Sequence, residues 1–197
     1  MLIIGGSRGL GAWTAKILAS LGSDVTITYN LGEEDAIEIQ SDINRYLEGK
    51  CDYFHLDVNR ISDLKINETY NQMYYFATPK IFGKQDSEWD EIIFEKFLSC
   101  YVNNFENIAT SLIRSGTKKI LFPSTIAIEK PVSGLEEYIE AKSLGEEKCK
   151  NLEKFFNIKI FTPRIDRVLT DQTATIFPTK SNDPFSVALD LIKIMNS

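Results

Sequence analysis

The chain has 197 residues, of which 43% are apolar and 25% charged, and its formal charge is −6 at pH 7. This length and composition are typical of one soluble globular domain, spanning residues 1–197, that folds without disulfides or a metal. The excess of 28 acidic over 22 basic side chains argues against a nucleic-acid partner, because a run of phosphates requires a basic surface. No segment approaches the roughly 18 consecutive apolar residues of a membrane span, and the N-terminus lacks a charged leader. We expect a cytoplasmic protein with no membrane partner.

The cysteine and histidine content limits the kinds of site that the chain can build. Cys51, Cys100 and Cys149 are odd in number and form no Cys-x-x-Cys pair, so we predict reduced thiols and no metal site. His55 is the only histidine, which excludes centres that need two imidazoles. A serine–histidine hydrolase could use only His55, and this residue lies within a predicted strand.

Strand-like and helix-like segments alternate along the chain, with no internal repeat. The predicted strands are residues 1–4, 24–29, 52–58, 73–77, 119–122 and 158–161. The predicted helices are residues 11–21, a helix beginning at Glu33, residues 86–114 as one bent helix or two, residues 135–155 and residues 184–195. We expect a short helix or turn at 61–66, and a lid or disordered loop at 170–183. This order predicts an α/β fold, a three-layer doubly wound parallel sheet of the Rossmann type in a single domain.

A glycine-rich turn joins the first strand to the first helix, with the sequence Gly5-Gly6-Ser7-Arg8-Gly9-Leu10-Gly11. Gly5 permits the tight turn, Gly9 allows close approach of a pyrophosphate, and Gly11 lets helix and strand pack closely. The N–H groups at the helix start can then bind phosphates. The alternative is a simple strand-to-helix turn without a ligand, but its place after the first strand of a βαβ unit favours a dinucleotide site.

The residues after the second and third strands bear on the choice of cofactor. The second strand ends in Thr28-Tyr29-Asn30 without the acid that usually binds the ribose 2′-hydroxyl of NAD. Arg8 can reach a 2′-phosphate, so we predict NADP(H) as the preferred cofactor, with NAD(H) as the alternative. In that alternative Arg8 is a solvated loop charge and Asn30 bonds a ribose hydroxyl. Asp57, followed by Val58, either accepts from the adenine amino group or caps the following turn.

Tyr138 and Lys142 stand at positions i and i+4 of the predicted helix 135–155, so a phenol and an ammonium share one face. An ammonium beside a phenol lowers its pKa from about 10 and suits it to general acid/base catalysis. Lys142 would also hold the hydroxyls of a nicotinamide ribose. Thr125 ends the fifth strand next to Ser124, where a hydroxyl can donate to a carbonyl oxygen that gains charge. By itself the Tyr–Lys pair is equally consistent with a surface pair, but these motifs occur in an order that places all of them at the carboxyl edge of the sheet.

The chain resembles the short-chain dehydrogenase/reductase family in Gly5-x-x-x-Gly9-x-Gly11, Asp57-Val58, Ser124-Thr125, Tyr138-x-x-x-Lys142 and Pro163. The resemblance implies a Rossmann fold, an NAD(P)(H) cofactor, and a mechanism in which Tyr138 exchanges a proton while hydride moves between nicotinamide and carbon. It implies that Thr125 takes the place of the family's catalytic serine, with Ser124 as the adjacent substitute, and that Pro163 covers the nicotinamide. The family's helix asparagine corresponds to Asn103, with Asn104 as the neighbouring choice. Ala77 lies in Phe76-Ala77-Thr78-Pro79, where the family usually has Asn-Asn-Ala-Gly beside the cofactor.

These features predict a hydride-transferring oxidoreductase that acts on a small-molecule carbonyl or secondary alcohol. Arg164, which follows Pro163, suggests that the substrate is anionic or sugar-linked. The alternatives are a nonenzymatic NAD(P)-binding regulatory or sensor protein, and a sugar-nucleotide epimerase or dehydratase that retains its cofactor. Segment 86–114 either packs against a second copy, in a homodimer or homotetramer, or covers the sheet with its aromatic residues Trp89, Phe97, Tyr101 and Phe105.

Overall fold

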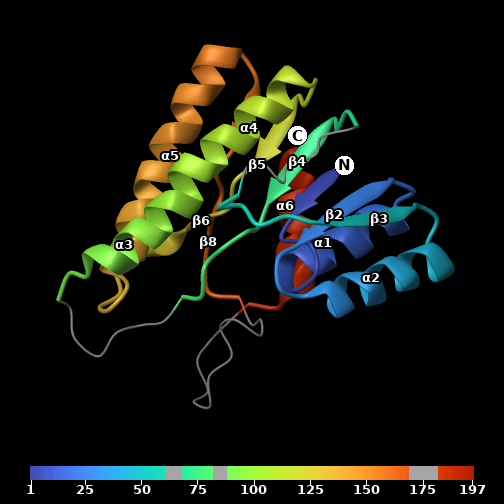
Figure 1. The fold of residues 1–197 in the computed structure, drawn as a ribbon, viewed down its shortest axis with the longest axis horizontal. Coiled ribbons are helices and arrows are strands. Elements are labelled where there is room, and N and C mark those ends of the chain that lie inside the picture. The colour runs from blue at the N-terminus through green and yellow to red at the C-terminus, as the bar shows by residue number, and fades with distance from the viewer. Residues whose placement is uncertain (61–67, 82–87, 169–181) are drawn as a thin grey trace.

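The computed structural model of the protein describes residues 1–60, 68–81, 88–168 and 182–197. Its centre is a six-stranded parallel sheet in the order β3-β2-β1-β4-β5-β7 (Figure 1). The strands are β1 Leu2–Ile4, β2 Val25–Tyr29, β3 Cys51–His55, β4 Gln72–Tyr75, β5 Lys119–Leu121 and β7 Lys159–Phe161. This is the strand order of the doubly wound Rossmann fold, so the predicted fold class is confirmed.

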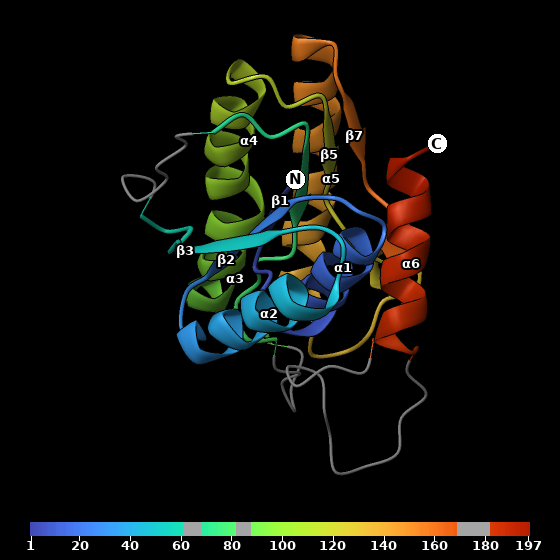
Figure 2. The ribbon, with the colours of Figure 1, turned by 90° about the vertical axis from the view of Figure 1, so that its right-hand side faces the viewer.

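Helices cover both faces of the sheet, as Figures 1 and 2 show. One face carries α1 Gly9–Ser20, α2 Glu33–Tyr46 and α6 Pro184–Met195. The other carries α3 Glu91–Leu98, the π-helical segment η2 Ser99–Asn104, α4 Phe105–Arg114 and α5 Glu136–Phe156. Two short strands, β6 Ser124–Thr125 and β8 Arg164–Ile165, pair in parallel beyond β5 and β7, and the 3₁₀ turn η3 spans Ile126–Ile128. Across the described ranges, no helix is long and apolar enough to cross a membrane.

The strands are apolar on both sides because each side faces a layer of helices. In β1, Leu2 and Ile4 pack into the core under α3, α4 and α5, whereas Ile3 packs into the core under α1 and α6. The same alternation puts Tyr75 in the first core and Tyr74 in the second. Consecutive residues of a strand point to opposite faces, so continuous apolar runs are the expected pattern for a sheet that is covered twice.

The predicted element limits differ from the structure at several ends. The third strand ends at His55 rather than at residue 58, and the fourth ends at Tyr75 rather than at residue 77. Strands β6 and β8 were not predicted, because two residues are too few to show a period. The predictions for 61–66 and for nearly all of 170–183 lie outside the described residues.

The predicted helix 86–114 is resolved as α3, η2 and α4 in direct succession. The Tyr75 hydroxyl, from β4, donates to the carbonyl oxygen of Cys100 inside η2 at 2.8 Å. A side chain that bonds a helix carbonyl in this way is a recognised cause of helix bending, and π-helical turns are frequent at functional sites.

The aromatic side chains of this segment cover the sheet. Phe97, Tyr101 and Phe105 are all buried within the chain itself. Only Trp89 remains exposed, with 49% of its surface accessible. Three of the four aromatic residues therefore belong to the core of this chain, and packing of the segment against a second copy stays a prediction.

Candidate functional site

The glycine turn lies between the carboxyl ends of β1 and β4, where the order of the strands reverses. Gly5 and Gly9 have positive φ angles of 76° and 55°, a region that side chains disfavour. A Cβ on Gly5 would lie 2.9 Å from the backbone nitrogen of Ala77, and a Cβ on Gly11 would lie 2.2 Å from the carbonyl oxygen of Gly5. The turn is therefore tight, it touches the loop after β4, and it brings the start of α1 against the end of β1.

An ion pair that the sequence did not reveal lies beside the glycine turn. Arg8 is exposed just before α1, and its Nε is 3.3 Å from Oδ2 of Asp35 in the first turn of α2. A Cβ on Gly32 would lie within 3.3 Å of both Asp35 and Arg8 and of the buried Ser7, so these side chains share one small region. The expected acid at the end of β2 is absent, but Asp35 reaches the same neighbourhood from the next helix. Only its place in the acidic helix start could have signalled it.

The other residues predicted to lie near the cofactor have different surroundings. Leu10 packs on the core under α1, whereas Asn30 is exposed after β2. Asp57 accepts hydrogen bonds from the backbone and side-chain nitrogens of Asn59, both at 3.0 Å, and its other oxygen lies 3.7 Å from Nε of Arg60. Of the two roles predicted for Asp57, the structure supports the one in which it caps the following turn. Val58 packs against the core.

Tyr138 and Thr125 meet at the start of α5. Thr125 is buried, and its Oγ1 accepts a hydrogen bond from the Ala127 backbone at 3.2 Å. Tyr138 is half-buried between the rings of Phe97 and Tyr101. Burial raises the pKa of Tyr138 to about 12, although a side-chain hydrogen bond with Thr125 acts in the opposite direction. The phenol is therefore a proton donor at neutral pH.

The ammonium of Lys142 lies among core residues. Lys142 is buried, and its Nζ donates to the carbonyl oxygen of Pro123 at 2.7 Å. The ammonium lies 3.9 Å from the ring centroid of Tyr101 and 4.6 Å from that of Phe122. Burial lowers the pKa of Lys142 to about 8. The predicted role of Lys142 in lowering the pKa of Tyr138 stays a prediction; in this structure the ammonium contacts Pro123, Tyr101 and Phe122.

Ser124 belongs to a hydrogen-bond network that runs from the buried Glu146 to the exposed Arg164 and Glu129. Its hydroxyl donates to Oε1 of Glu146 at 2.6 Å, and Arg164 donates to both oxygens of Glu146 at 2.8 and 2.7 Å. Arg164 also donates to Glu129 at 2.9 Å. Burial alone would raise the pKa of Glu146, but the hydrogen bonds from Arg164 and Ser124 lower it. Because Ser124 is committed to this network, Thr125 is the better candidate for the carbonyl donor. Glu146 stands four residues after Lys142, a spacing that could have identified it.

The remaining predicted residues lie at different depths. Ala77 is half-buried, and its carbonyl oxygen lies 3.6 Å from Sγ of Cys100. Pro163 is half-buried after β7, and its carbonyl accepts from the Ser124 backbone at 2.9 Å. Asn103 is exposed, whereas Asn104 is buried and donates to Asn59 at 3.0 Å. The structure thus places Asn104, and not Asn103, inside the molecule, because successive residues of a helical turn project in different directions.

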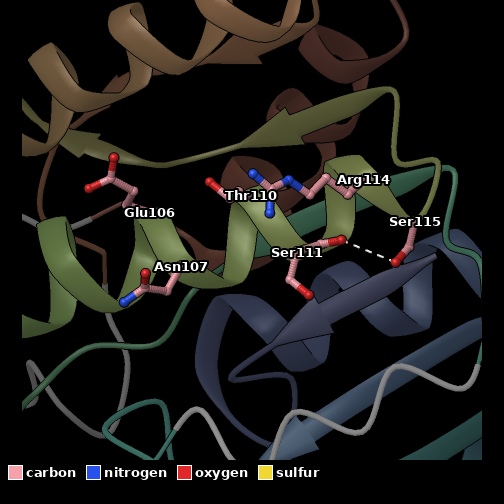
Figure 3. Close-up of a pocket in the computed structure, with 6 residues that line it drawn as sticks. All are labelled: Glu106, Asn107, Thr110, Ser111, Arg114 and Ser115. Carbon is pink, nitrogen blue, oxygen red and sulfur yellow. Dashed lines mark hydrogen bonds between the residues drawn. The ribbon is translucent and has the colours of Figure 1, made fainter.

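An open surface groove follows the outer side of α4, as Figure 3 shows. Its lining residues are polar: Glu106, Asn107, Thr110, Ser111, Arg114 and Ser115. None of the residues discussed above lines this groove. The residues that could bind a cofactor or move a proton follow β1, β4, β5 and β7, and the carboxyl ends of parallel strands meet at one edge of the sheet. We therefore take this edge as the candidate active site.

Known proteins match this chain in structure but not in sequence. No model of a known protein family matches the chain, and no curated protein matches it. Solved structures do match. A short-chain dehydrogenase/reductase from Serratia marcescens is 18% identical with a TM-score of 0.86, over 98% of this chain and 89% of that one. A short-chain dehydrogenase from Burkholderia cenocepacia J2315, in complex with NADP, is 17% identical with a TM-score of 0.85 over the same shares.

An alcohol dehydrogenase from the archaeon Thermococcus sibiricus, complexed with 5-hydroxy-NADP, is 17% identical with a TM-score of 0.81. That comparison covers all of this chain and 89% of the other. At such identities the likeness establishes the fold: the chain has the Rossmann fold of the short-chain dehydrogenase/reductases. The fold implied by the sequence resemblance is confirmed, and the roles of individual residues stay predictions.

Proposed function

We propose that this chain is an NAD(P)(H)-dependent oxidoreductase that transfers a hydride to or from a carbonyl or secondary alcohol, with Tyr138 as the general acid/base. The observation that carries the proposal is the placement of two features at one edge of the sheet. The glycine turn follows β1, and Thr125 and Tyr138 follow β5 along the chain. Ligands of open α/β sheets bind at this edge, where the strand order reverses.

The residues present fit a dinucleotide. Gly5 and Gly9, both with positive φ angles, form the turn that leads into α1. The start of α1 has no acidic side chain in its first turn, so its N–H groups suit phosphate oxygens. Arg8 lies exposed at the same turn. When bound, the nicotinamide supplies or accepts the hydride. In this proposal Lys142 would hold the ribose hydroxyls, which requires its side chain to leave the carbonyl of Pro123.

The proton chemistry follows from the ionisation of Tyr138. In reduction, its hydroxyl would give a proton to the substrate oxygen as the hydride reaches the adjacent carbon. In oxidation, its phenolate would take the proton of the alcohol. Because burial raises the pKa of Tyr138 to about 12, the neutral phenol, which is the form that donates a proton in reduction, dominates near pH 7. The hydroxyl of Thr125 would donate to the same substrate oxygen and stabilise its developing charge.

The structure removes one argument about the substrate. The guanidinium of Arg164 makes three hydrogen bonds to Glu146 and Glu129. Its charge is therefore used within the protein, so the inference of an anionic or sugar-linked substrate from Arg164 has no support. The proposal is limited to a small-molecule carbonyl or alcohol.

Cofactor binding is tested first, by titrating the protein with NADPH and NADH and following fluorescence. We expect NADPH to bind more tightly, and Arg8→Ala to weaken NADPH more than NADH because the 2′-phosphate loses its basic partner. Lys16→Ala is the matched control, since Lys16 also pairs with α2, through Asp42 at 2.8 Å, but lies about two turns further along α1. Failure of the wild-type protein to bind either nucleotide at millimolar concentration would refute the proposed function.

Tyr138→Phe tests the catalytic role. The variant keeps the ring contacts and loses the hydroxyl, so we expect a turnover about 10²- to 10⁴-fold lower with an unchanged Kd for NADPH. A panel of aldehydes and ketones, followed by NADPH absorbance, provides the substrate. Tyr46→Phe is the control, because Tyr46 is exposed at the end of α2. Full turnover in Tyr138→Phe contradicts the assignment.

A nonenzymatic NAD(P)-binding sensor is the second candidate. The observation in its favour is the orientation of Lys142, whose ammonium is bonded to Pro123 and does not tune Tyr138. A sensor needs the glycine turn and has no need of a tuned phenol. Tight NADPH binding together with the absence of turnover on the whole substrate panel would favour this candidate.

A further inference from the structure

One buried side chain contacts both residues that the proposed function assigns to catalysis. Tyr101 lies in η2 and is almost wholly buried. Its ring packs edge-on against Tyr138, with centroids 5.9 Å apart, and the Nζ of Lys142 lies 3.9 Å from its centroid. Its hydroxyl forms a short hydrogen bond with Thr78, in the loop after β4. No motif in the sequence distinguishes Tyr101 from an ordinary core aromatic residue.

The π-helical segment is what points Tyr101 into the site. The Tyr75 hydroxyl bonds the carbonyl of Cys100, the residue just before Tyr101. A π-helical turn changes the direction of the side chains that follow it relative to an α-helix. Tyr101 is thereby directed toward Lys142 and Tyr138 on α5, and its hydroxyl reaches β4's loop. Backbone irregularity of this kind commonly serves a site.

The environment of Lys142 gives the ring of Tyr101 a specific task. The ammonium is out of water, and only one hydrogen bond, to the Pro123 carbonyl, accompanies its contacts with two rings among the described residues. An aromatic face attracts a cation, and more strongly when the cation is desolvated. The ionisable groups that face Lys142 are Cys100 from η2 and Cys149 and Glu146 from α5. The ring of Tyr101 thus compensates in part for the hydration that the buried ammonium of Lys142 loses.

We propose that Tyr101 is a positioning residue of the candidate site, which holds the Lys142 ammonium against its ring and joins it, through Thr78, to the loop after β4. It acts through Lys142 and Thr78 and does not touch the reacting atoms. The functional part of the proposal rests on the proposed function, because Lys142 would hold the cofactor's ribose. The contact between ring and ammonium is a property of the protein alone and is measured without a cofactor.

The test measures the ionisation of Lys142 in the free protein. Lysine labelled with ¹³C at Cε is followed by NMR from pH 6 to 10, and the resonance of Lys142 is assigned by its loss in Lys142→Met. We expect a midpoint near 8 in the wild type and a midpoint lower by about 0.5 to 1 pH unit in Tyr101→Leu, since the ring that favours the charged amine is removed. Phe97→Leu is the matched control, because Phe97 stacks on Tyr101 at 5.9 Å and packs on Tyr138. Its Lys142 should titrate as in the wild type.

A second pair of variants tests the link to the loop after β4 and needs no loss of the ring. Tyr101→Phe keeps the ring and loses the hydroxyl, and Thr78→Val removes its partner. We expect each to weaken NADPH binding by about 2- to 10-fold, the value of one hydrogen bond, and the double variant to show no further loss. Lys142 should keep its wild-type midpoint in Tyr101→Phe.

The outcomes separate this proposal from the proposed function. A Lys142 midpoint in Tyr101→Leu equal to that of the wild type would overturn the positioning role, whether or not NADPH binds. If Tyr101→Leu does not fold, NADPH binding by Tyr101→Phe that equals the wild type overturns the proposal instead. If the wild type binds neither nucleotide, the proposed function is refuted. A Lys142 midpoint that is nevertheless lower in Tyr101→Leu than in the wild type supports the contact between ring and ammonium.

Discussion

Replacing Lys142 by Met tests the electrostatics of the site without a cofactor or a substrate. In the unfolded chain the amine ionises at its usual pKa of 10.5, whereas burial in the folded protein lowers that pKa to about 8. Each pH unit between the two values corresponds to about 1.4 kcal/mol. Below pH 8 the folded protein is therefore less stable, by about 3 kcal/mol, than it would be with a neutral amine at this position.

The sign of the pH dependence follows from proton binding. Between pH 8 and 10.5 the unfolded chain keeps the proton on Lys142 and the folded protein does not, so stability rises with pH. Lys142→Met lacks this titration. The free energy of unfolding of the wild type, relative to that of Lys142→Met, should therefore increase by about 2 to 3 kcal/mol from pH 7 to pH 10. Using the difference between two proteins cancels the other titrating groups.

Urea unfolding at pH 7, 8, 9 and 10, followed by circular dichroism, measures this difference. Lys154→Met is the control, because Lys154 is exposed on the same helix. Its difference from the wild type should stay constant over this pH range. A constant difference for Lys142→Met as well would refute the reasoning, since it would mean that the ammonium is not buried in the folded protein.

Three further changes have expected outcomes. Gly11→Ala should lower the free energy of unfolding by about 1 to 3 kcal/mol in urea titrations, because its Cβ would lie 2.2 Å from a backbone oxygen. Equal stability of Gly11→Ala and the wild type would contradict this. Asp35→Asn removes the carboxylate that lies 3.3 Å from Arg8. The variant should bind NADPH about 2- to 5-fold more tightly in fluorescence titrations, and weaker binding would contradict the role given to Arg8. Glu146→Gln should lower the melting temperature at pH 7. Hydrogen bonds hold the pKa of Glu146 below its usual value of 4.5, so the difference in melting temperature should shrink as the pH falls below 4.5. A difference independent of pH would show that the charge of Glu146 is not involved.

Much of the fold could be predicted because local patterns are strong at the strands and helix starts. The continuous apolar run of β1 and the glycine turn after it define the first βα unit from the sequence alone. The run from residue 86 to 114 was identified as helical, but its π-helical segment was not. That segment depends on a hydroxyl from Tyr75, which is about 25 residues away in the chain, and a local period contains no information on such a contact.

The candidate site was likewise predictable only in part. The spacing of Tyr138 and Lys142 correctly places both on one helix, and the order of motifs places Thr125 near Tyr138. The direction of the Lys142 side chain could not be predicted, because i and i+4 spacing fixes the position of a Cβ and leaves a long side chain free. Pro123 and Tyr101 decide that direction through the tertiary structure.

The sequence by itself determined the order of the six sheet strands and of the helices between them, and the glycine turn, because periodicity, glycine geometry and parallel connectivity are local or topological properties. Only the tertiary structure decided which charges are paired. Asp35 reaches Arg8 from the next helix, and Arg164 is taken up by Glu146 rather than left for a substrate. Burial and partner choice depend on elements that meet only when the chain is folded, and these two factors set the ionisation of the site.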